Sequence, residues 1–141
     1  MLKELLASGY GNGEMDLSCS EKILYGANEV YNLGLSEDAL KLSAGFGAGM
    51  GIDSVCGALT GAVMVLGRLF VEKNAHASMQ VFDLNQELFK KYLAKMGDIN
   101  CAPLKAKYRT EEEKCNRVIL KAAEFLDEMV NRELQARVSP N

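Results

Sequence analysis

Residues 45–67 read GFGAGMGIDSVCGALTGAVMVLG, and the glycine-rich first half leads into an uncharged second half. The second half predicts a helix from about Ser54 to about Glu72 that is buried on most faces. Asp53 is a natural N-cap for it, because a carboxylate accepts the free N–H groups of a first helical turn. Gly57 and Gly61 lie on one face of this helix, so we expect another backbone to pack closely against them.

Helix signals recur on both sides of this stretch. Two S/T-x-x-E capping boxes, Ser18 with Glu21 and Thr110 with Glu113, predict the starts of an early helix and of the last helix. Gly97 is placed to end a further helix. We see no strand alternation, so the sequence predicts an all-α fold, a single-domain bundle of five or six helices around a buried central helix. The last residues, Ser139 to Asn141, are expected to be a frayed end.

The composition of the chain excludes several classes of protein. The 141 residues suit one domain, 1–141, and 48% hydrophobic with 25% charged residues is typical of a globular chain. A net charge of -3 gives no nucleic-acid signature. No signal peptide is visible, and residues 54–67 are too short an apolar stretch to insert into a membrane. We therefore expect a cytoplasmic protein, where cysteines stay reduced and more often serve metal or redox chemistry than structural disulfides.

The four cysteines are Cys19, Cys56, Cys101 and Cys115, and each lies near the predicted start of a helix. Helix starts stabilise thiolates, although a single cysteine is more often a small buried hydrophobe. With Asp53 as the cap, Cys56 is in the first turn, and we expect its pKa to be lowered. If burial raises that pKa instead, Cys56 is a structural residue or a ligand that is charged only by its metal, and thiol transfer by Cys56 gives way to the metal-binding module.

The spacing of the cysteines excludes some kinds of site. No C-x-x-C pair occurs, so neither a thioredoxin-type pair nor a zinc knuckle is present. A shared site must gather the cysteines from separate helices, and we expect their sulfurs to meet around one point. Two chemistries remain open, a bound iron–sulfur cluster or zinc ion and a dithiol that cycles with a disulfide.

The glycines, His76 and a basic segment give weaker evidence about function than the cysteines do. The glycines match no G-x-G-x-x-G dinucleotide motif. His76, the one histidine, is interpreted as a surface or helix-end residue. A basic segment surrounds Cys115 and is interpreted as a solvated face. Its functional alternative is a positive field that acts on Cys115 or docks an acidic redox partner, and its members are Lys105, Lys107, Arg109, Lys114, Arg117 and Lys121.

Residues 56–61, CGALTG, match the pattern C-G-A-x-x-G in full. With one cysteine before the motif and two after it, the chain resembles the redox-active protein family named C_GCAxxG_C_C from Cys19 to Cys115. The resemblance implies that Cys19, Cys56, Cys101 and Cys115 are the family's defining cysteines. It supplies no substrate and no established cofactor.

These observations predict a redox protein that uses Cys19, Cys56, Cys101 and Cys115 for thiol/disulfide or electron transfer, with Cys56 as the central thiolate. The alternative is an iron–sulfur or other metal-binding module with the same four ligands. A third reading is a structural protein with inert cysteines. The sequence does not identify a redox partner. It also does not decide whether the protein is an enzyme or whether it forms a homo-oligomer.

Overall fold

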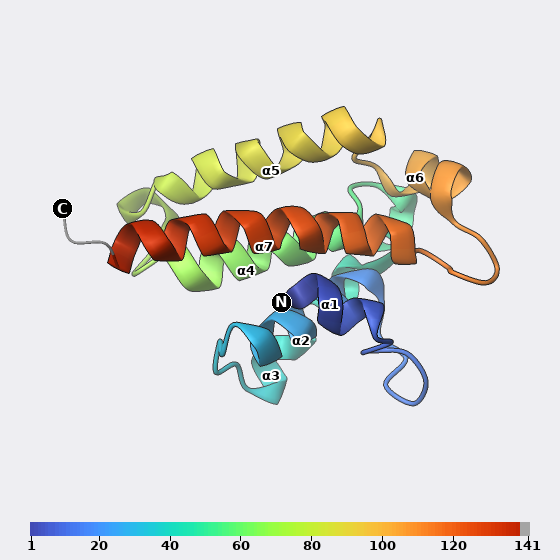
Figure 1. Cartoon of the computed structure of the whole chain (residues 1–141), viewed down its shortest axis with the longest axis horizontal. Helices are drawn as coiled ribbons and strands as arrows, with labels where there is room; N and C mark the ends of the chain where they lie inside the picture. The colour runs from blue at the N-terminus through green and yellow to red at the C-terminus, as the bar shows by residue number, and fades with distance from the viewer. Residues whose placement is uncertain (139–141) are drawn as a thin grey trace.

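The computed structural model describes residues 1–138, which form seven α-helices and three short helical turns with no β-strand (Figure 1). The predicted all-α fold is confirmed. Five or six helices were expected, and two of the seven, α1 and α3, have only six and five residues. The elements are α1 (Leu2–Ala7), α2 (Cys19–Val30), α3 (Glu37–Lys41), η1 (Ala44–Phe46), η2 (Gly49–Asp53), α4 (Gly57–Phe70), η3 (Ala75–Ala77), α5 (Gln80–Met96), α6 (Cys101–Tyr108) and α7 (Asn116–Val138).

Several helix boundaries follow the local signals in the sequence. The Ser18 N–H donates to the Glu21 carboxylate at 3.0 Å, and α2 begins at Cys19 as the capping box predicts. Gly97 follows α5 with a φ of 90°, a left-handed conformation that glycine adopts at little cost. These boundaries depend on neighbours in the sequence, which is why the sequence predicts them.

The predicted start of the central helix is wrong. Asp53 has a φ of 56° at the end of η2 and does not cap α4. Beyond it the chain runs extended and pairs with the segment before α6, where the Cys56 N–H donates to the Ile99 carbonyl at 2.8 Å. Because extended residues cannot begin a helix, α4 starts at Gly57 and Cys56 is its N-cap.

The predicted start of the last helix is also wrong. Thr110 does accept a hydrogen bond from the Glu113 N–H, at 2.9 Å, as a cap would. However, the Lys114 N–H donates to the Thr110 carbonyl at 2.8 Å, which closes a turn instead of a helix. α7 begins at Asn116, so Cys115 lies in the loop before the helix and not on its second turn.

Helix α4 forms the centre of the core, as its apolar sequence predicts. The buried apolar side chains make one cluster, in which α4 contributes Ala58, Leu59, Ala62, Val65 and Leu66. Helices α5 and α7 pack against α4 along the long axis of the molecule, whereas α1, α2 and α3 lie on its other side (Figure 1). In residues 1–138 no helix is both long enough and apolar enough to cross a membrane.

Helices α2 and α4 touch at the two glycines of the CGALTG motif. A Cβ at Gly57 would lie 2.6 Å from Cys19 Sγ, and a Cβ at Gly61 would lie 2.8 Å from the Ser20 carbonyl oxygen. Real Cβ atoms do not approach other atoms this closely, so the absence of side chains allows the contact. The expected close backbone contact is confirmed, and it fixes Cys19 beside the start of α4.

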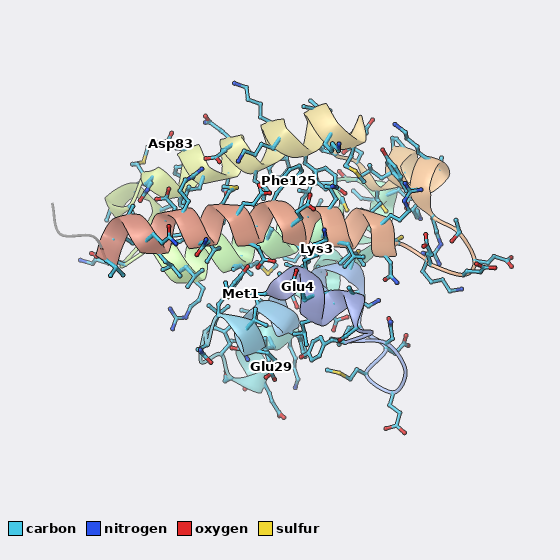
Figure 2. All side chains as sticks on the ribbon, viewed as in Figure 1. Met1, Lys3, Glu4, Glu29, Asp83 and Phe125 are labelled. Atoms are coloured by element: carbon cyan, nitrogen blue, oxygen red, sulfur yellow. The ribbon has the colours of Figure 1, made fainter. Side chains whose placement is uncertain are left out.

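Helix α1 packs against both α7 and α2. Asp127 on α7 accepts hydrogen bonds from the N–H groups of Leu2 at 2.9 Å and Lys3 at 3.0 Å, and Lys3 Nζ lies 2.8 Å from a Glu124 oxygen. Figure 2 shows the labelled Lys3 between α1 and α7. A Cβ at Gly26 of α2 would lie 2.8 Å from Leu2 Cδ1, so α1 also packs tightly on α2.

A pair of glycine substitutions tests the contact between α2 and α4. Gly61→Ala should lower the free energy of unfolding by about 1–3 kcal/mol, because the added methyl group overlaps the Ser20 carbonyl. Gly67→Ala is the matched control on the same helix, since its Cβ would meet nothing within 4 Å. That control should stabilise the protein by up to about 1 kcal/mol through helix propensity. Urea unfolding measures both, and equal effects of the two substitutions would contradict this contact.

Candidate functional site

Three of the four cysteines line one cavity of about 720 Å³, namely Cys19, Cys101 and Cys115. The walls come from two regions far apart in the sequence, residues 11–22 and residues 101–119, together with Ala48. In Figure 1 the loops after α1 and before α7 project at the same end of the molecule. Cys56 is not part of this lining, and all four cysteines are free thiols.

Cys19 is the first residue of α2 and is partly exposed. The capping box fixes the start of this helix, and the glycine contact with α4 fixes its position in space. The sulfur therefore lies against Gly57, the first residue of α4. This brings Cys19 close to Cys56, and negative charge on Cys19 contributes to raising the pKa of the Cys56 thiol.

The predicted low-pKa thiolate at Cys56 is wrong. Cys56 is only 4% exposed, and burial is the main cause that raises the pKa of its thiol to about 12. The N–H groups of Ala58 and Leu59 act in the opposite direction. A helix dipole contributes about one pKa unit at most, so desolvation by the surrounding apolar side chains dominates.

Cys101 begins α6 and is covered by the glycine-rich loop. It is 7% exposed, and a Cβ at Gly49 would lie 2.8 Å from Cys101 Cβ. The Cys101 N–H donates to the Ser54 carbonyl at 2.5 Å. Burial raises the pKa of the Cys101 thiol, and the Lys105 ammonium one turn further along α6 opposes this shift.

Asp53 has a role that the sequence did not predict. Its carboxylate lies 2.9 Å from Lys105 Nζ, and this hydrogen bond lowers the pKa of Asp53. The ion pair joins the glycine-rich loop to α6 next to Cys101. No local signal relates residues 53 and 105, because the contact depends on the pairing of the two extended segments.

Cys115 is the third cysteine that lines the cavity. It lies in the loop before α7, is partly exposed, and accepts a hydrogen bond at 3.2 Å from Arg109 Nη1. The basic segment around Cys115 thus includes one residue that contacts the sulfur directly. Arginine N–H groups stabilise negative charge on an acceptor atom.

No ready-made metal site is found in residues 1–138, since no three side chains of His, Cys, Asp or Glu are grouped so that they could hold a metal ion. His76 is exposed in η3, as expected for a surface or helix-end residue. The cavity lining combines three thiols with both cationic and acidic side chains.

The raised pKa of Cys56 should affect both the alkylation rate of this thiol and the pH dependence of protein stability. Alkylation of Cys56 should stay slow up to about pH 10 and rise only toward pH 12, because the thiolate is the reactive form. The unfolded-state pKa is about 8.5 and the folded-state pKa is higher, so stability is retained below pH 8.5 and lost as the pH rises further. Cys56→Ala should reduce that loss.

Peptide mass mapping after timed alkylation measures the rate at each cysteine, with the partly exposed Cys115 as the internal reference. If Cys56 is alkylated as fast as Cys115 near neutral pH, burial does not control the reactivity of the Cys56 thiol.

Comparison with known proteins places the chain in a family. A family model described as "Putative redox-active protein (C_GCAxxG_C_C)" matches residues 17–129, a range that includes all four cysteines. No curated protein and no solved structure matches the chain. Because the matched range covers most of the sequence, the chain belongs to the C_GCAxxG_C_C family.

Proposed function

We propose that this protein is a thiol redox protein that exchanges two electrons with a disulfide through the cysteines of the cavity. One observation carries the proposal: Cys19, Cys101 and Cys115 line the same cavity, and the partly exposed Cys115 accepts a hydrogen bond from Arg109. The family's redox description agrees with it.

Cys115 is the best candidate for the attacking thiol. Cys56 and Cys101 are 4% and 7% exposed, and burial raises the pKa of both thiols. Cys115 is more accessible, and the Arg109 guanidinium can stabilise the negative charge on sulfur that forms and disappears during exchange. The central role that the sequence predicted for Cys56 therefore passes to Cys115.

The proposed reaction is balanced between the protein and its partner. The Cys115 thiolate attacks one sulfur of the partner disulfide, which forms a mixed disulfide and releases the first partner thiol. Cys19 or Cys101, which line the same cavity, then attacks Cys115 Sγ, gives up its proton to solvent and releases the second partner thiol. Two protein thiols lose two electrons, and the two partner sulfurs gain them.

The second candidate is an iron–sulfur or zinc module with Cys19, Cys56, Cys101 and Cys115 as ligands. One observation favours it: a cysteine as buried as Cys56 carries a charge only if a metal ion displaces its proton. The lack of a preformed group of ligands in residues 1–138 ranks this candidate below thiol exchange.

Metal content and cysteine variants test the proposal together. Protein purified without oxygen should be colourless, contain no stoichiometric metal and take up two oxidising equivalents per chain. Cys115→Ser should slow the reduction of a disulfide by at least about a hundredfold, because it removes the attacking sulfur. Arg109→Gln should slow it by about tenfold through loss of the charged hydrogen bond.

Cys56→Ser is the matched control, because it removes a thiol that lies outside the cavity lining. Its rate should stay within about threefold of wild type if the variant folds, which circular dichroism checks. Stoichiometric iron and sulfide that are lost equally in all four cysteine variants would replace this proposal with the metal module.

A further inference from the structure

We infer that the cavity selects small disulfides that carry both carboxylate and ammonium groups, as in disulfides of amino-acid or peptide thiols, over uncharged disulfides and over disulfides of folded proteins. This inference rests on the proposed thiol exchange and adds the class of substrate.

The shape of the site favours a small molecule. A volume of about 720 Å³ lies within the range of small-molecule sites, about 300–1,000 Å³. Cys101 is nearly buried at the wall of this cavity, and Cys19 and Cys115 are only partly exposed. A disulfide must therefore enter the cavity to meet these sulfurs, which a disulfide held in the surface of a folded protein does less easily.

The charges on the walls favour carboxylates. Lys22, Arg109 and Lys114 line the cavity, and among residues 1–138 none of them forms an ion pair. Lys22 Nζ bonds only to the neutral Asn12 side chain, at 2.6 Å, and Arg109 bonds to the Cys115 sulfur. Three cations are thus available to a ligand within reach of the reactive cysteine.

The acidic side chains on the cavity walls favour a ligand that also carries an ammonium group. Asp16, Glu112 and Glu113 also line the cavity, and within the described part of the chain none of them forms an ion pair. Lysines and carboxylates that share a cavity without pairing with each other suit a ligand that brings both signs of charge. An ammonium group next to a carboxylate, as in an amino acid, meets this requirement.

The backbone around the cavity is held in uncommon conformations. Six non-glycine residues of the described chain have a positive φ, and three of them, Asp16, Ala48 and Lys114, line the cavity. Each costs free energy relative to an ordinary conformation, and such residues gather at binding and catalytic sites. These three residues come from three separate segments of the cavity wall.

The test compares three disulfides with the reduced protein. Oxidised glutathione carries carboxylates and ammonium groups, bis(2-hydroxyethyl) disulfide is uncharged, and cystamine carries only positive charge. Each rate is divided by the rate of the same disulfide with N-acetylcysteamine, an uncharged thiol, which removes the intrinsic reactivity of the disulfide. The normalised rate for oxidised glutathione should exceed the uncharged rate by about tenfold at low salt, and this preference should shrink at high salt.

Charge variants test whether Lys22 and Lys114 cause the preference for oxidised glutathione over the uncharged disulfide. Lys22→Gln combined with Lys114→Gln should lower the normalised rate for oxidised glutathione by about tenfold more than it lowers the uncharged rate. Lys73→Gln is the matched control, because Lys73 is exposed in the connection between α4 and α5 and is absent from the cavity. It should leave the ratio of the two rates unchanged.

Each failure has a separate meaning. Equal normalised rates for the three disulfides, or a faster reaction with the disulfides of folded insulin, would overturn the inference and leave the proposed thiol exchange intact. No reaction with any of these disulfides would overturn the proposed thiol exchange, and the inference with it.

Discussion

The contact between α2 and α4 at Gly57 and Gly61 is the constraint on which the site depends. With no side chain at either position, the Ser20 backbone and the Cys19 sulfur lie directly against α4. This contact brings the first residue of α2 to the start of α4, next to Cys56. Any side chain at these glycines would push the helices apart and would move Cys19 away from the cavity.

A second constraint divides the four cysteines into different environments. The extended residues before α4 pair with the residues before α6, through the hydrogen bonds from Cys56 to Ile99 and from Cys101 to Ser54. This pairing buries Cys56 and Cys101, whereas Cys115 follows the turn from Thr110 to Lys114 and stays partly exposed in the cavity lining. The burial of Cys56 and Cys101 therefore follows from backbone pairing between distant segments.

The sequence predicted what local signals control. Its capping box at Ser18, its helix end at Gly97, the close contact at Gly61 and the family motif are all confirmed. The start of α4 and the pKa of Cys56 were wrong, because each depends on hydrogen bonds or burial between distant segments. The start of α7 was wrong because the hydrogen bond from Lys114 to Thr110 closes a turn ahead of the helix. The single domain over residues 1–141 stays a prediction, and the frayed end at residues 139–141 lies outside the described residues.

The central claim is that Cys115 reacts inside a cavity shared with Cys19 and Cys101, while Cys56 stays a buried thiol. The most direct measurement is peptide mapping of the protein after oxidation by one equivalent of a disulfide, with free thiols blocked before digestion. The account predicts a disulfide between Cys115 and either Cys19 or Cys101, with Cys56 recovered as a thiol. A disulfide that contains Cys56, or oxidation that leaves Cys115 free, would contradict it.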